Sequence, residues 1–78
     1  MTTAQIVKEL RNNLPPSYAV EGVDRPYYCE VRVMKRNSGF FRELRIAKTH
    51  MDDFKLRRIA EALKNDELEF RQQKRTWP

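Results

Sequence analysis

The feature that most constrains this chain is the segment 27–48, in which apolar and polar residues alternate on both sides of an Asn-Ser-Gly sequence. A period of two is typical of strands that bury one face, and Asn, Ser and Gly favour turns. We therefore predict an antiparallel β-hairpin. Placing Val33 opposite Leu44 puts the apolar partners on one side, with a two-residue turn (38–39) or a four-residue loop (37–40) between the strands.

A helix is predicted before the hairpin, over residues 3–13, because its apolar side chains recur at helical spacing. Thr2 and Gln5 have the spacing of a capping box at its start. Two prolines at 15–16 end it, since proline cannot continue a helix and restricts the residue before it. Residues 17–26 fit two interpretations: a short edge strand, or a loop favoured by the glycine and proline they contain.

A second helix is predicted after Thr49, which has the spacing of an N-cap pair with Asp52. Asn65-Asp66 could interrupt this helix, and residues 71–78 could form a flexible basic tail. The predicted fold is one α+β domain over residues 1–78, a two-layer α-(β)-β-β-α arrangement with an antiparallel hairpin packed against two helices. The expected core consists of Leu10, Val31, Val33, Leu44, Ile46, Leu56, Ile59 and Leu63.

The outward side of the hairpin is the first candidate binding surface. In the predicted register Arg32 lies opposite Arg45, and Arg36 lies opposite Phe41, with Tyr28 on the same side. Like charges that face each other across strands are destabilising unless an anion or nearby acids neutralise them. Arginine beside aromatic rings on a sheet can hold single-stranded nucleic acid through phosphate contacts and stacking. The alternative is a solvated face whose glutamates and arginines pair locally.

Two further basic clusters are candidates. Lys35, Arg36 and Arg42 lie near the turn, where a basic tip could contact a phosphate backbone or could simply protect the strands from aggregation. The C-terminal cluster could be a phosphate-binding arm, or its tryptophan could fold back onto the helix. That cluster consists of Arg71, Lys74, Arg75 and Trp77.

Composition narrows the class of protein. The net charge of +5 over 78 residues favours an anionic partner without requiring one. With one cysteine and one histidine, neither an internal disulfide nor a metal cluster is expected, and we predict no cofactor. No apolar run reaches the roughly 18 residues of a membrane span, and Lys8 and Glu9 stand where a signal peptide would be uniformly apolar. A cytoplasmic protein without membrane contact is therefore expected.

Catalysis is not expected. Cys29 and His50 could form a thiol–imidazole pair, but both fall on the predicted core side, where cysteine is usually an inert apolar residue. The two glycines are isolated, so no phosphate-binding loop is present. The acidic residues within 52–53 and 66–69 lie near helix starts, which explains them without a metal ion.

The predicted element order is similar to the αβββα order of the double-stranded-RNA-binding domain. The resemblance stops at the order, because the basic cluster that this domain carries at the start of its second helix is replaced by the acidic segment 49–53. The GXXG loop of KH domains and the aromatic-glycine strand motif of RNA-recognition motifs are absent. The sequence identifies no family.

We therefore predict a small non-enzymatic protein that binds nucleic acid, RNA or DNA, with the basic and aromatic face of its hairpin. The alternative is a protein-interaction or inhibitor module, of the accessory kind that phages and plasmids carry, that binds an acidic surface of a partner protein. A homodimer through the hairpin edges is predicted for the case in which residues 17–23 form no strand.

Overall fold

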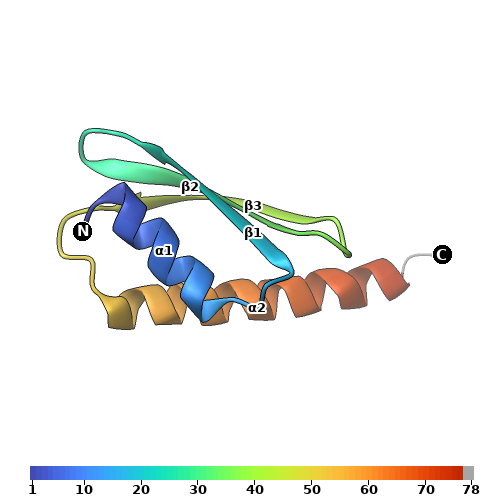
Figure 1. Cartoon of the computed structure of the whole chain (residues 1–78). Coiled ribbons are helices and arrows are strands. Elements are labelled where there is room, and N and C mark those ends of the chain that lie inside the picture. The colour runs from blue at the N-terminus through green and yellow to red at the C-terminus, as the bar shows by residue number, and fades with distance from the viewer. Residues whose placement is uncertain (77–78) are drawn as a thin grey trace.

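The computed structural model describes the backbone of residues 1–76 and the side chains of residues 1–73. Its elements are α1 (Thr3–Asn13), β1 (Tyr18–Asp24), β2 (Tyr28–Lys35), β3 (Phe40–Ala47) and α2 (Asp53–Thr76). The strands form one antiparallel sheet in the order β1-β2-β3, and the two helices lie against each other on one side of it (Figure 1). The predicted α+β class, with a hairpin packed against two helices, is confirmed.

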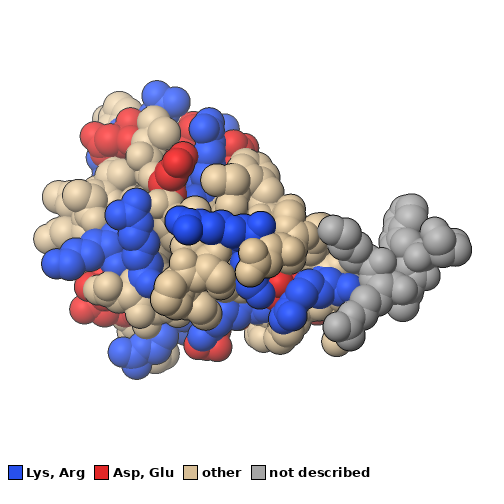
Figure 2. All heavy atoms as spheres, turned by 45° about the vertical axis from the view of Figure 1, so that its right-hand side comes forward, with Lys and Arg blue, Asp and Glu red and all other residues tan. Residues whose placement is uncertain are grey.

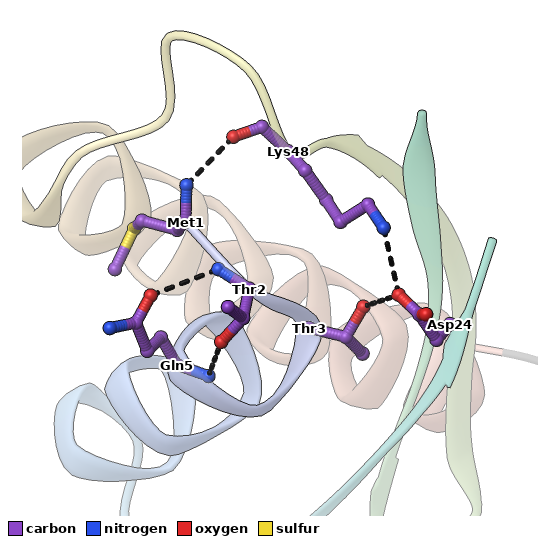
Figure 3. A network of polar contacts seen from close by, with 6 residues as sticks. All are labelled: Met1, Thr2, Thr3, Gln5, Asp24 and Lys48. Atoms are coloured by element: carbon purple, nitrogen blue, oxygen red, sulfur yellow. Dashed lines mark hydrogen bonds and ion pairs between the residues drawn. The ribbon is translucent and has the colours of Figure 1, made fainter. Parts of the chain in front are cut away.

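The first helix begins and ends where the sequence predicts. The Thr2 hydroxyl accepts a hydrogen bond from the Gln5 amide at 3.2 Å, and the Gln5 side-chain oxygen accepts one from the Thr2 amide at 2.9 Å (Figure 3). This reciprocal capping box satisfies two amides that the first turn leaves without partners. Leu14 then adopts extended backbone angles, φ −117° and ψ 148°, as a residue before proline prefers.

Residues 18–24 form an edge strand, so the strand interpretation of the 17–26 segment is the correct one. Burial of Tyr18 and Val20 outweighs the weak strand preference of Gly22. The glycine is required by packing, because a Cβ at position 22 would lie 2.5 Å from the Cγ2 of Val7 on α1. Since β1 pairs with β2, the hairpin does not have two open edges, and the condition set for the hairpin-edge dimer is not met.

The hairpin register differs from the predicted one by two residues. Val31 lies opposite Leu44, and Val33 lies opposite Arg42. A shift of two residues keeps each side chain on its predicted face, so alternation of apolar and polar residues cannot distinguish the two registers. The strands are joined by residues 36–39, whose glycine has a φ of 73°, and both predicted turns are therefore wrong.

The core lies between the sheet and the two helices. Of the eight predicted core residues, Leu44 and Ile59 are only partly buried and pack at the margin of the core. Leu44 lies on the helix-covered side of the edge strand β3, between the buried residues Phe40 and Ile46. The buried apolar residues are Ile6, Val7, Leu10, Leu14, Tyr18, Val20, Cys29, Val31, Val33, Phe40, Ile46, Leu56, Ala60 and Leu63.

The second helix starts later than predicted and runs without a break. Its N-cap is Asp52, whose carboxylate accepts a hydrogen bond from the Lys55 amide at 2.8 Å. Thr49 lies before the helix, because His50 turns the chain with a φ of 60°. The interruption considered at Asn65-Asp66 does not occur. The helix therefore presents one continuous face to the core as far as Phe70, whose ring centroid lies 5.9 Å from that of Phe40.

A polar network fastens the start of α1 to the ends of β1 and β3 (Figure 3). The Met1 ammonium donates to the Lys48 carbonyl at 2.9 Å, and the Lys48 ammonium lies 2.9 Å from an Asp24 carboxylate oxygen. The Thr3 hydroxyl donates to the same oxygen. The hydrogen bonds from Thr3 and Lys48 hold the pKa of Asp24 below its ordinary value. This carboxylate thus ties α1 across the end of the sheet.

Candidate functional site

One face of the sheet is covered by the helices, and the other is open. We call this second surface the open face. It carries alternate side chains of all three strands, and paired residues lie side by side in rows across the sheet. Beginning at the hairpin turn, the rows are Ala19, Met34 and Phe41; Glu21, Arg32 and Glu43; Val23, Glu30 and Arg45; and Tyr28 with Ala47.

Charges of both signs lie on the open face, and two of its glutamates form ion pairs. The Arg32 guanidinium lies 3.1 Å from the Glu43 carboxylate, and Glu30 lies 3.5 Å from Arg25 in the adjoining turn. The predicted Arg32–Arg45 pair is wrong, because the two-residue shift places Arg45 opposite Glu30. Arg45 also lies over an aromatic ring, that of Tyr28, at 5.6 Å. The open face therefore has no marked excess of positive charge, and the stacking partner of its arginine comes from the same chain.

Apolar side chains are also exposed on the open face. Met34 and Phe41 lie opposite each other in the first row, and their residues are 37% and 44% exposed. Val23, on the other edge of the sheet, is 37% exposed. Methionine, aromatic residues and arginine are enriched in surfaces that bind proteins. The predicted Arg36–Phe41 pair does not form in this register, since Arg36 lies in the turn.

The hairpin turn and the second half of α2 meet at one carboxylate. Glu67 is 1% exposed, its Oε1 lies 3.0 Å from the Lys35 ammonium, and Arg71 Nε lies 2.8 Å from the same oxygen. Lys35 and Arg71, which were predicted in separate basic clusters, therefore share one partner. Glu67 itself was predicted only as a residue near a helix start. The signal that could have found it is its spacing, because position 67 follows Leu63 by four residues on the apolar stripe.

The environment of Glu67 keeps it ionised. Burial alone would raise the pKa of Glu67, but the hydrogen bond and charge of Lys35, together with those of Arg71, outweigh burial and hold the pKa below its ordinary value. Burial raises the pKa of the neighbouring Tyr18 hydroxyl, and the negative charge of Glu67 adds to that effect. Glu67 is thus a clamp between the sheet and α2. Because Lys35 is bound to it, this lysine is not available to a ligand.

Two arginines, one in the hairpin turn and one at the start of β3, have no carboxylate partner among the described side chains. Arg36 is exposed and makes no ion pair there, and Arg42 is exposed with its guanidinium 4.8 Å from the Phe40 ring. Figure 2 turns this end of the molecule toward the viewer. Lys and Arg side chains are distributed over the surface with Asp and Glu between them. The available cations do not form one continuous basic patch on this side.

The remaining predicted site residues lie at the C-terminal end. Helix α2 includes residues 71–76. The side chains of Lys74 and Arg75 and the whole of Trp77 lie outside the described residues. Arg71 is the member of this cluster that the structure describes, and it is paired with Glu67.

The thiol and the imidazole lie in different surroundings. Cys29 is fully buried, and burial is the main reason why the pKa of its thiol is raised, so the thiol is protonated at neutral pH. His50, which was predicted on the core side, is exposed in the connection before α2. Among the side chains of residues 1–73, no group of three His, Cys, Asp or Glu residues is placed to hold a metal ion.

No helix within the described residues is long and apolar enough to cross a membrane. In comparisons with known proteins, no protein-family model, no curated protein and no solved structure matches this chain.

Proposed function

We propose that this chain is a protein-interaction module whose open face docks onto a partner protein. The main support is that Met34 and Phe41 are exposed next to a row of charged residues. That row consists of Glu21, Arg32 and Glu43, of which the last two form an ion pair. Exposed apolar side chains lose unfavourable contact with water when a partner covers them, and charges of both signs add specificity.

The balance of charge favours a protein over nucleic acid at this surface. A phosphate backbone requires several unpaired cations along its path, since its affinity comes from neutralising phosphates. On the open face, Arg32 is bound to Glu43, Glu30 is ion-paired with Arg25, and Arg45 is the residue opposite Glu30 in the sheet. A nucleic acid would have to compete with these carboxylates. It would also meet their negative charge directly.

The rows define the chemistry of the partner. Its contact surface would place an apolar side chain against Met34 and Phe41, and charges of both signs against the row that contains Arg32. A uniformly acidic surface would meet Glu21 and Glu43 as like charges. The sequence alone suggested a partner protein with an acidic surface. We propose instead a partner surface that carries charges of both signs next to a protruding apolar side chain.

The test compares two variants of the immobilised chain. In the first, Met34→Ala and Phe41→Ala remove the apolar row of the open face. In the second, Phe54→Ala removes a more exposed ring, 64% exposed, from α2. Proteins retained from a nuclease-treated lysate are identified, and the affinity of the purified partner for each variant is measured by calorimetry.

We expect the double alanine variant to bind its partner at least about tenfold more weakly, because central apolar anchors carry much of an interface's free energy. Phe54→Ala should bind as the wild type does. Equal retention by all three chains, or retention of no protein at all, would contradict the proposal. Circular-dichroism melts confirm that each variant is folded.

Nucleic-acid binding is the second candidate, and it rests on Arg36 and Arg42, the exposed arginines in and near the turn that have no carboxylate partner among the described side chains. If this candidate is correct, the chain retains a mixed nucleic-acid pool, and retention falls steeply between about 50 and 200 mM salt. Arg36→Glu combined with Arg42→Glu should abolish that retention, while Met34→Ala with Phe41→Ala should leave it unchanged.

A further inference from the structure

The two edges of the sheet are protected to different degrees. Along β1, the Arg11 guanidinium donates two hydrogen bonds to the Val20 carbonyl, at 2.7 and 3.2 Å. Farther along the strand, Val7 lies against Gly22 and Thr3 binds Asp24. Helix α1 therefore covers this edge along most of its length. Open strand edges are sites where a further strand can add, and proteins usually block them in such ways.

The backbone groups that β3 leaves free can be identified from the ladder. The Lys48 amide donates to the Tyr27 carbonyl at 3.2 Å, which continues the β2–β3 pairing. In an antiparallel ladder, every second residue points its amide and carbonyl at the neighbouring strand. The even-numbered residues of β3 are therefore bonded to β2. The residues whose amides and carbonyls point away from the sheet are Phe41, Glu43, Arg45 and Ala47.

No other strand covers this edge among the described residues, since β3 pairs with β2 alone. One local contact occurs there: the Arg42 side chain donates to the outward carbonyl of Phe41 at 2.9 Å. A carbonyl oxygen has two lone pairs, so this contact does not prevent a second hydrogen bond. The edge is therefore open to an eight-residue partner strand, the length of β3.

The sequence of β3 is complementary to itself in one register. In a dimer around a twofold axis normal to the sheet, each residue of one β3 faces a residue of the other β3 on the same side of the sheet. The two residue numbers of every such pair add up to the same even sum, and this sum defines the register. A sum of 86 would oppose Glu43 to its own copy, and a sum of 90 would oppose Arg45 to its own copy. A sum of 88 instead opposes Glu43 to Arg45 of the second copy, twice by symmetry. The remaining registers pair no opposite charges on the open face.

We propose that the chain forms a homodimer by antiparallel pairing of β3 with β3 of a second copy, centred on Leu44. Each Glu43–Arg45 pair then exchanges two backbone hydrogen bonds and adds a salt bridge on the open face. On the helix-covered side, the partly exposed Leu44 side chain meets its own copy. The product is a six-stranded sheet with a doubled open face. The dimer does not require the protein partner proposed above.

The register is tested by two complementary charge reversals. In its own dimer, Glu43→Lys places the introduced lysine opposite Arg45 of the other copy, which creates two repulsive pairs by symmetry. Arg45→Glu likewise places the introduced glutamate opposite Glu43 of the other copy, again twice. In a mixed dimer of one chain of each kind, both cross-strand pairs are of opposite sign. Sedimentation equilibrium at high micromolar concentration is the measurement.

We expect the wild type to sediment at twice 9.4 kDa, each single variant at 9.4 kDa, and an equimolar mixture of the two again at twice that mass. The control is Glu21→Lys, which makes the same change of charge on β1 of the same face, and it should remain dimeric. A wild type that is monomeric overturns the dimer. Single variants that stay dimeric, or a mixture that stays monomeric while the wild type dimerises, overturn this register.

Discussion

Replacement of Glu67 with glutamine tests the clamp between the hairpin and α2. The substitution preserves the shape and one acceptor oxygen, and it removes the negative charge that holds Lys35 and Arg71. In the folded wild type that carboxylate is 1% exposed and has cation contacts of 2.8 and 3.0 Å. The variant therefore leaves two cations beside a buried neutral amide whose –NH₂ group cannot accept a hydrogen bond from them.

The structure sets the expected magnitude. Breaking a fully buried ion pair costs about 3–5 kcal/mol, because the remaining charge is left without a partner. Here the Lys35 side chain retains 18% exposure and that of Arg71 45%, so water recovers part of the loss. We expect Glu67→Gln to lower the free energy of unfolding by about 2–3 kcal/mol, below the buried-pair range. For a domain of this size, that corresponds to a fall in melting temperature of roughly 8–24 °C.

The assay is urea denaturation followed by circular dichroism, with Glu61→Gln as the matched control. Glu61 lies on the same helix and is paired with Lys64 at 2.7 Å, but its side chain is exposed, so its loss should cost about 0–1 kcal/mol. Because the folded pKa of Glu67 is lowered, its contribution is complete above the ordinary value of 4.5 and is lost as the pH falls through the folded value. The difference between wild type and Glu67→Gln should therefore shrink in acid. A Glu67→Gln variant no less stable than Glu61→Gln at neutral pH would refute the clamp.

Three further predictions concern packing. Gly22→Ala should destabilise the domain by about 1–3 kcal/mol, since its Cβ would meet Val7, and Val7→Ala in the same chain should recover part of that loss in a denaturation experiment. Leu56→Ala should cost about 2–5 kcal/mol and Ile59→Ala clearly less, because the first side chain is fully buried and the second is at the margin; equal costs would show that the helix face is misplaced. Cys29 should react with a thiol-specific disulfide reagent only as fast as the domain opens, so native labelling at the rate of the unfolded chain would contradict its burial.

The fold class could be predicted because the apolar residues recur at clear periods, two in the hairpin and 3.6 in the helices. The register could not be predicted from that signal, since shifts of two residues leave every face unchanged. Electrostatics contained the missing information. In the observed register Arg32 opposes Glu43 and Arg45 opposes Glu30, whereas the predicted one opposed two arginines.

The candidate site was predicted in part. The open-face residues lie where alternation places them, but their basic character depended on the incorrect register. Glu67 was missed because a glutamate after Asn65-Asp66 is typical of a helix start, and the buried pair becomes visible only when the hairpin turn is placed beside α2. Asp52 replaced Thr49 as the cap because His50 takes a left-handed conformation that alternation and periodicity do not encode.

The contact between α1 and α2 has a consequence for the order in which the chain folds (Figure 1). The three strands are joined by residues 25–27 and 36–39, so their pairing closes short loops. The two helices are separated by the whole sheet, and loop-closure entropy makes their contact the later event. During synthesis, the part of the sheet that α2 covers must therefore remain exposed until residues 56–63 have left the ribosome. Docking of the apolar stripe of α2 is the closing step of assembly, and slow translation of that helix would prolong the exposure of Val31 and Val33.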